Sequence, residues 1–137
     1  MFEGMKIFVA GHTGLLCSAV VSALRKRGCA HIVTRTREDL DLMDGPAVMK
    51  FFSGQRFDCV FLCAGKVGGI KSNQEYPADY LRVNLGIQTS VFEAARRSDV
   101  SHLVFYGSSC TYPLASKQPI KESSLDRKST RLNSSHV

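Results

Sequence analysis

The sequence has no apolar run that approaches the roughly 20 residues of a membrane-spanning helix. Its first residues also lack the positively charged start and the long apolar region of a secretory signal peptide. These two absences predict a cytoplasmic protein with no membrane partner. The five cysteines include no Cys-x-x-Cys pair, and three of them fall in or beside segments that we expect to be buried. We therefore expect reduced thiols and no metal site.

A continuous basic stripe is also missing, although the formal net charge is +6. The basic residues are scattered, and several lie near the C-terminus: Lys121, Arg127, Lys128 and Arg131. This pattern argues against nucleic acid as a partner, because nucleic-acid-binding domains gather their positive charge on one face. A basic pocket for a phosphorylated ligand explains the charge balance equally well.

Two patterns alternate along the 137 residues, a length that allows one ordinary domain. Short β-rich apolar runs are followed by segments of helical periodicity: residues 7–10 and 15–27, 31–34 and 46–54, 59–64 and 77–97, and finally 103–106. Such alternation is typical of α/β proteins with a parallel sheet. Right-handed crossovers then predict a partial, doubly wound, Rossmann-like sheet of about four strands in the order 3-2-1-4, with the first and fourth strands adjacent.

The segment 77–97 contains a mostly apolar stripe at helical spacing. The stripe consists of Leu81, Leu85, Gln88, Val91, Phe92 and Ala95. We expect these side chains to face the core.

A glycine turn, Gly11-x-x-Gly14, lies between the first apolar run and the first helical segment. A strand that enters such a turn and then a helix directs free backbone N–H groups at one point, where a phosphate can bind. Gly11 permits the tight turn and Gly14 a close approach of the pyrophosphate, while Cys17 occupies the third position, which normally holds a small residue. The motif alone is weak, and a plain strand-to-helix turn is the alternative.

Two arginines, Arg35 and Arg37, follow the second predicted strand. At this point NAD-specific folds usually carry an acidic residue for the ribose 2′-hydroxyl, whereas a 2′-phosphate favours arginine. The sequence therefore predicts NADP as the cofactor. The alternative is that both arginines are solvated surface charges partnered by Glu38 and Asp39.

Other residues complete the predicted cofactor site. Asp41 and Leu42 are placed to line the adenine, and the small pair Ala64 and Gly65 after the third strand lets the cofactor lie close to the backbone. The full predicted set is Gly11, Thr13, Gly14, Leu15, Leu16, Arg37, Asp41, Leu42, Ala64 and Gly65.

A second glycine-bearing loop, residues 107–113, follows the fourth strand and is expected to face the reactive end of the cofactor. The hydroxyl of Ser108 is suited to hydrogen-bond a substrate carbonyl, and the thiol of Cys110 is suited to exchange a proton with carbon. These two residues are the catalytic candidates. A polar turn with a structural cysteine is the alternative.

Five segments together resemble the GDP-L-fucose synthase family of extended short-chain dehydrogenases. They are Gly11-His12-x-Gly14, Arg35-Thr36-Arg37, Lys66-Val67-Gly68-Gly69-Ile70, Tyr76-Pro77-Ala78-Asp79 and Gly107-Ser108-Ser109-Cys110-x-Tyr112-Pro113. The resemblance extends from Met5 to Leu125. The glycine motif is shared widely among these dehydrogenases, whereas the segments 66–70 and 108–113 are far more selective.

The resemblance implies a bifunctional, NADP-dependent enzyme that is a homodimer at full length. It would epimerise C3 and C5 of a nucleotide sugar, GDP-4-keto-6-deoxymannose, and then reduce the C4 ketone with hydride from NADPH. Ser108 would hydrogen-bond the C4 oxygen, and Cys110 would move protons during epimerisation. Two positions depart from the family pattern: Thr13, where members often carry arginine, and Cys17, where they carry glycine.

The resemblance also implies parts that these residues do not supply. The family's Tyr-x-x-x-Lys pair is expected near position 137, and a substrate domain should follow. We therefore expect an N-terminal fragment that is catalytically inactive, because hydride transfer would have no matched acid. The alternatives are another NAD(P)-dependent nucleotide-sugar epimerase or dehydratase, against which the segment 66–70 argues, and a non-catalytic NADP-binding module.

The last twelve residues break the rhythm of the preceding segments, since they are polar and have no usable apolar period. They resemble a translated sequencing-library adapter. We expect an NADP-binding Rossmann domain over residues 1–125, followed by a non-native or disordered tail over 126–137. A natural disordered terminus is the alternative.

Overall fold

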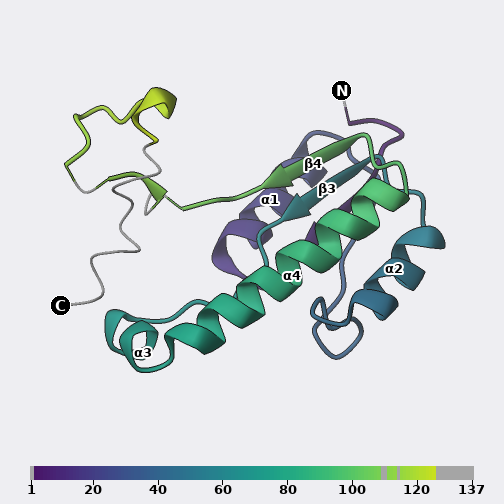
Figure 1. Cartoon of the computed structure of the whole chain (residues 1–137). Coiled ribbons are helices and arrows are strands. Elements are labelled where there is room, and N and C mark those ends of the chain that lie inside the picture. The colour runs from purple at the N-terminus through teal and green to yellow at the C-terminus, as the bar shows by residue number, and fades with distance from the viewer. Residues whose placement is uncertain (1, 109–110, 114, 126–137) are drawn as a thin grey trace. The chain divides into compact units, whose positions relative to one another are not determined.

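The computed structural model describes residues 2–108, 111–113 and 115–125. The chain divides into two compact units, Met1–Tyr106 and Gly107–Val137. The first contains, in chain order, β1 (Lys6–Ala10), α1 (Leu15–Lys26), β2 (His31–Val33), α2 (Gly45–Ser53), β3 (Cys59–Leu62), α3 (Ile70–Glu75), α4 (Pro77–Arg97) and β4 (His102–Phe105) (Figure 1). The second contains the short 3-10 helix η2 (Glu122–Ser124). The tail over 126–137 lies outside the described residues, so the boundary expected after residue 125 stays a prediction.

The four strands form one parallel sheet, which confirms the predicted α/β class. Their order is β2-β1-β3-β4. Phe8 of β1 is paired with Val33 of β2 on one side and with Val60 of β3 on the other. The predicted order 3-2-1-4 is therefore wrong, and so is the adjacency of the first and fourth strands, because β3 lies between them.

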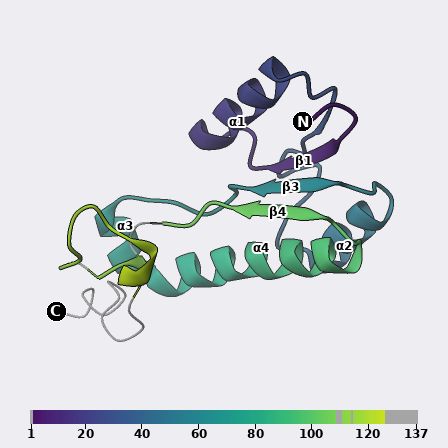
Figure 2. The same ribbon diagram turned by 90° about the horizontal axis from the view of Figure 1, so that it is seen from above.

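The position of the second helix explains this order. A right-handed crossover places its helix on one face when the chain moves one way across the sheet, and on the other face when it moves back. Figure 2 shows α1 on one face of the sheet and α2 with α4 on the opposite face. On that second face Phe8 contacts the rings of Phe51, Phe52 and Phe57, at centroid distances of 5.2, 5.6 and 5.3 Å. The order 3-2-1-4 would have put α2 on the α1 face and left Phe8 without this cover.

Helix α2 begins where the sequence signals it. The side chain of Asp44 accepts a hydrogen bond from the N–H of Ala47 at 3.0 Å, and Pro46 lies in the first turn. This cap and the proline, which needs no hydrogen-bond acceptor there, define the start of the helix.

Helix α4 buries a different face from the one predicted. Its buried side chains are Ile87, Val91, Ala94 and Ala95. Leu81, Leu85 and Phe92 of the predicted stripe are 59%, 50% and 40% exposed. The four buried side chains pack in one cluster with Phe8, Val60 and the buried residues of α2. Of the predicted stripe only Val91 and Ala95 are buried, so the prediction was only partly correct.

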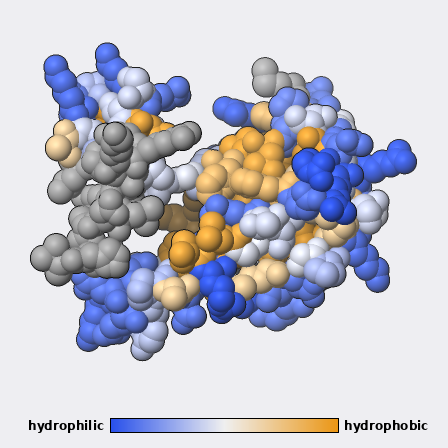
Figure 3. Space-filling model, in the orientation of Figure 1, coloured by the Kyte–Doolittle hydropathy of each residue, from blue (hydrophilic) through white to orange (hydrophobic). Residues whose placement is uncertain are grey.

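Strand β4 has one neighbouring strand among the described residues. Its apolar side chains remain between 36% and 42% exposed, and Phe92 packs edge-on against Phe105 at 5.6 Å. Figure 3 shows the resulting hydrophobic surface over β4.

Candidate functional site

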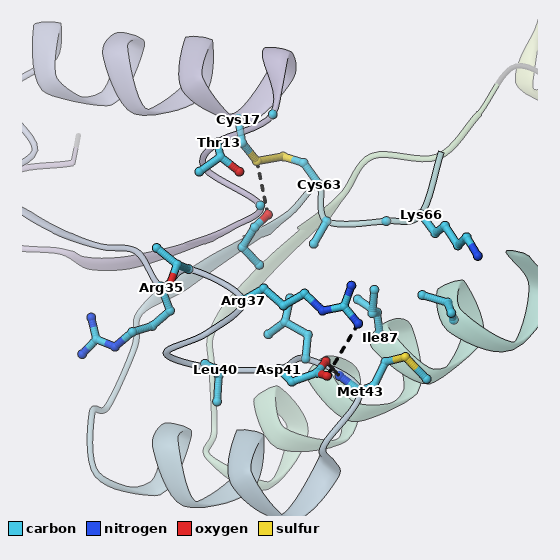
Figure 4. A pocket seen from close by; sticks show the side chains of 18 of the residues that line it. Thr13, Cys17, Arg35, Arg37, Leu40, Asp41, Met43, Cys63, Lys66 and Ile87 are labelled. Carbon is cyan, nitrogen blue, oxygen red and sulfur yellow. Dashed lines mark hydrogen bonds and ion pairs between the residues drawn. A yellow bond between two sulfur atoms is a disulfide. The ribbon is translucent and has the colours of Figure 1, made fainter. Parts of the chain in front are cut away.

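A cavity of about 890 Å³ opens at the carboxyl ends of β1 and β3. Its walls come from the turn between β1 and α1, the loop after β2, the loop after β3 and one face of α4 (Figure 4). Every residue predicted for cofactor binding lines it: Gly11, Thr13, Gly14, Leu15, Leu16, Arg37, Asp41, Leu42, Ala64 and Gly65. The structure thus brings these residues together, while their role in binding stays a prediction.

The turn between β1 and α1 depends on Gly11. Its φ is +92°, in the region that glycine adopts readily and other residues do not. A Cβ at Gly11 would also lie 2.9 Å from the Cα and from the N of Ala64. The Gly14 N–H donates to the Gly11 carbonyl at 2.9 Å and closes the turn. The backbone of the turn therefore lies directly against the loop after β3, with no side chain between them.

Helix α1 begins at this turn without a side-chain cap. Its N-cap residue is Gly14, its first turn contains no acidic residue, and Arg25 and Lys26 lie in its last turn. The N–H groups of a first turn have no partner within the helix, and the helix dipole makes this end positive. Since Leu15 and Leu16 line the cavity, this end of the helix is suited to a phosphate.

The two arginines after β2 have different surroundings. Arg37 reaches into the cavity, where its guanidinium lies 3.9 Å from the carboxylate of Asp41 (Figure 4). Arg35 instead donates to the Thr34 carbonyl at 2.8 Å and lies over the ring of Phe51. Both arginines therefore line the cavity, but only the guanidinium of Arg37 points into it (Figure 4).

Asp39 closes a turn over residues 36–39, which contains Arg37. Its carboxylate accepts hydrogen bonds from the hydroxyl of Thr36 at 2.9 Å and from the Thr36 N–H at 3.3 Å. These hydrogen bonds lower the pKa of Asp39 below its ordinary value. The ion pair of Arg37 is with Asp41, whereas Arg35 contributes to the lowered pKa of Asp39 through its charge. The Arg37 side chain is 78% exposed, so the alternative of two solvated arginines stays open.

The segment after Gly65 is fixed by Asn84, a residue of α4 that no sequence motif indicated. The Asn84 Oδ1 accepts from the Lys66 N–H at 2.7 Å, and its Nδ2 donates to the Lys66 carbonyl at 3.0 Å. One turn earlier on α4, the ring of Tyr80 lies 4.8 Å below the Lys66 ammonium group, and its hydroxyl is 2.8 Å from that of Ser72. Tyr80 and Asn84 thus hold Lys66 from one face of α4. In the sequence, only the i, i+4 spacing of these two residues could have indicated that they act together.

The described residues show neither a cluster of metal ligands nor a membrane-spanning helix. Residues 2–108, 111–113 and 115–125 contain no group of three or more His, Cys, Asp or Glu side chains that could hold a metal ion. Within the same ranges, no helix combines the length and the apolar character that crossing a membrane requires.

The geometry at the β1 and β3 ends agrees with a sequence comparison. Residues 7–136 match the NAD dependent epimerase/dehydratase family. The chain belongs to this family.

Curated members of the epimerase/dehydratase family confirm the resemblance that the motifs indicated. The chain is 47% identical to GDP-L-fucose synthase of Escherichia coli K12 over 120 residues, which are 88% of this chain and 37% of that protein. It is 49% identical to GDP-L-fucose synthase 1 of Arabidopsis thaliana over 123 residues, which are 90% and 38% of the two chains. The chain therefore spans little more than a third of the length of these relatives.

Solved structures related to the family have the same fold. A GDP-mannoheptose C4 reductase from Campylobacter jejuni with NADP bound superposes with a TM-score of 0.84 at 39% identity, over 91% of this chain and 39% of that one. A GDP-L-fucose synthetase from Naegleria fowleri bound to NADP superposes with a TM-score of 0.78 at 25% identity, over 91% and 38%. The Rossmann-like class expected for an epimerase/dehydratase is thus confirmed.

The cysteines at the cavity differ from the expectation of reduced thiols. Cys17 and Cys63, 46 residues apart, form a disulfide, whereas Cys29 and Cys59 are free and buried. Burial raises the pKa of the Cys59 thiol. No local sequence pattern indicates this pair, because only the packing of α1 beside β3 in the epimerase/dehydratase fold brings the two residues together.

The catalytic candidates lie in the second unit. Ser108 is exposed, and its carbonyl accepts a hydrogen bond from the Thr111 hydroxyl at 2.9 Å. Cys110 lies outside the described residues. The first and fourth strands, whose adjacency supported the expectation that this loop faces the cofactor, are not adjacent, and the expectation itself stays a prediction. Within the first unit of this epimerase/dehydratase chain, the glycine turn lies against the loop after β3.

Proposed function

We propose that this chain is the NADP-binding part of an epimerase and reductase that converts GDP-4-keto-6-deoxymannose into GDP-L-fucose. One observation carries the proposal. The uncapped start of α1, Arg37 and the small residues Ala64 and Gly65 line one cavity at the switch point of the sheet. Relatives named GDP-L-fucose synthase, and related reductases with NADP bound, support the choice of substrate and cofactor.

The residues of the cavity fit a dinucleotide that carries a 2′-phosphate. The start of α1 would hold the pyrophosphate, because its N–H groups lie at the cavity and no acidic side chain in its first turn repels an anion. Arg37 would hold the 2′-phosphate, oriented by its contact with Asp41. The cofactor, when bound, supplies hydride to a ketone.

The loop after β4 would provide the substrate chemistry. Ser108 would donate a hydrogen bond to the C4 oxygen, which stabilises the enolate that forms when a neighbouring proton leaves. Cys110 would remove and return protons at the epimerised carbons. We also propose a homodimer for the complete enzyme and a cytoplasmic location.

The 137 residues include no Tyr-x-x-x-Lys. We therefore propose that the chain of 137 residues binds NADPH without turning over the keto-sugar. Turnover by the purified chain, followed by NADPH consumption, would contradict this part of the proposal.

The cofactor assignment is tested by measuring the Kd of the chain for NADPH and for NADH, each from the change in cofactor fluorescence during a titration. The unchanged chain should prefer NADPH, and Arg37→Ala should weaken NADPH binding by roughly 10-fold to 100-fold, because a hydrogen bond to a charged group contributes about 1.5–3 kcal/mol. NADH binding should change little. Arg35→Ala is the matched control, because Arg35 lines the same cavity and carries the same charge, but its guanidinium lies over the ring of Phe51. Equal effects of the two substitutions, or no preference for NADPH, would overturn the assignment.

A further inference from the structure

The Cys17–Cys63 disulfide joins the two segments that form the pyrophosphate end of the cavity. Cys17 lies in the first turn of α1, and Cys63 directly follows β3. Both residues line the cavity, and Figure 4 shows the sulfur–sulfur bond crossing from α1 to the loop after β3. The next residue after Cys63 is Ala64, whose backbone abuts Gly11.

The fold accommodates both redox states of this pair. The Cα atoms are 6.1 Å apart, within the usual range for a disulfide. The Cys17 sulfur also lies 3.3 Å from the carbonyl oxygen of Ala10. A reduced Cys17 would therefore have an acceptor for its S–H group in its buried position, and reduction would not leave a polar group unsatisfied.

The two cysteines differ in access. Cys17 is fully buried, whereas Cys63 is half-buried at the cavity wall. A small thiol or disulfide can thus reach the pair from the cavity side, through Cys63. Cys29 and Cys59 are buried in the packing between α1 and the sheet, so thiol–disulfide exchange should be faster at Cys63 than at either of these two cysteines.

We propose that Cys17 and Cys63 are a reversible disulfide that follows the thiol–disulfide balance of its surroundings, and that an occupied cavity slows its exchange. The slower exchange in the occupied cavity, which we call gating, rests on the proposed function, whereas the reversible crosslink does not. The disulfide ties the first turn of α1 to the loop after β3 in the oxidised state. In the reduced state the pairing of β1 with β3 and the contact of Gly11 with Ala64 join the two segments without this covalent bond.

The oxidant is a low-molecular-weight disulfide such as glutathione disulfide. The thiolate of Cys63 attacks one of its sulfur atoms, which gives a mixed disulfide and releases one glutathione. The thiolate of Cys17 then displaces the second glutathione and forms the Cys17–Cys63 bond. In total two cysteine thiols are oxidised to one disulfide, and one glutathione disulfide is reduced to two glutathione thiols that take up the two protons.

Peptide mapping tests the crosslink. The full chain is equilibrated with glutathione disulfide, its free thiols are alkylated in denaturant, and it is digested. Trypsin places Cys17 in the peptide 7–25 but leaves Cys59 and Cys63 together in 57–66, so chymotrypsin is added to cut between these two cysteines. A linked pair of peptides with Cys17 and Cys63 is expected, and Cys59→Ala, the matched control, should retain it. Alkylation of both residues in the equilibrated chain would overturn the proposal.

The rate of reduction tests the gating. The crosslinked chain is treated with dithiothreitol with and without NADPH, while binding of NADPH is measured separately by its fluorescence. If only the empty cavity admits the reductant, NADPH at ten times its Kd should slow reduction about 11-fold. A chain that binds NADPH but is reduced at an unchanged rate overturns the gating alone. A chain that binds no NADPH overturns the gating and the proposed function together, and the peptide map still decides the crosslink.

Discussion

Gly11→Ala is the substitution that most directly tests how the turn and the sheet fit together. The new methyl group would be placed 2.9 Å from two backbone atoms of Ala64. Backbone atoms cannot rotate away as the end of a flexible side chain can. The loop after β3 or the turn itself must therefore move, at a position where φ is already +92°.

Two terms set the magnitude. A left-handed backbone conformation costs a non-glycine residue about 1–2 kcal/mol. Forcing an extra carbon into a packed position costs about 1–3 kcal/mol more. The free energy of unfolding should thus fall by about 2–5 kcal/mol, which the midpoint of urea unfolding, followed by circular dichroism, reports when the slope m is unchanged.

Gly28→Ala separates the two terms. Gly28 has a φ of +79°, but the atoms nearest to its added Cβ are 3.8 and 3.9 Å away on the side chain of Glu3. This control should lose only the conformational part, about 1–2 kcal/mol. If Gly11→Ala costs no more than Gly28→Ala, the close approach of the turn to Ala64 does not constrain the fold and the reasoning is refuted.

Three other predictions concern the cap, a surface carboxylate and the disulfide. Asp44→Ala should lower the free energy of unfolding by about 1 kcal/mol through loss of the α2 cap, whereas Asp44→Asn should retain most of it; equal losses in urea unfolding would contradict this. Hydrogen bonds from two arginines one turn along α4 lower the pKa of Glu93 from 4.5 to about 2. Its contribution to stability should therefore be complete above pH 4.5 and be lost as the pH falls through about 2. A carboxyl titration by NMR with a midpoint near the ordinary value would exclude this. Reduction of the Cys17–Cys63 bond, which closes a loop of 46 residues, should lower the free energy of unfolding by about 4 kcal/mol. Cys63→Ala should be destabilised by this amount relative to the oxidised wild-type chain, and dithiothreitol should not change its free energy of unfolding. If dithiothreitol leaves the free energy of unfolding of the wild-type chain unchanged, the estimate is refuted.

The sequence predicted the parallel sheet because the alternation of apolar runs and helical segments reports local burial. It did not predict the strand order, since a right-handed crossover can leave β2 in either direction. That choice depends on which face of β1 must be covered. Phe8 is the large side chain on the α2 face, and nothing in the local pattern shows that Phe51, Phe52 and Phe57 will surround it.

The candidate site shows the same division. Gly11, Gly14 and Arg37 could be predicted because each conforms to a requirement of one local segment, a turn or the end of a strand. Asn84 and the Cys17–Cys63 bond could not, because each joins segments that only the assembled fold brings into contact.

The sheet divides the interior into two unequal parts. The cluster on the α1 side is the smaller one, and the cluster on the α2 and α4 side contains most of the large buried side chains. Because opening free energies follow the amount of buried apolar contact, native-state hydrogen exchange should show α1 opening as a separate unit before α4. The Cys17–Cys63 bond fastens this weaker unit to β3. With the disulfide formed, the amide hydrogens of α1 would exchange only on global unfolding, and with the disulfide reduced they would exchange earlier. The cavity wall formed by the start of α1 would then open together with α1.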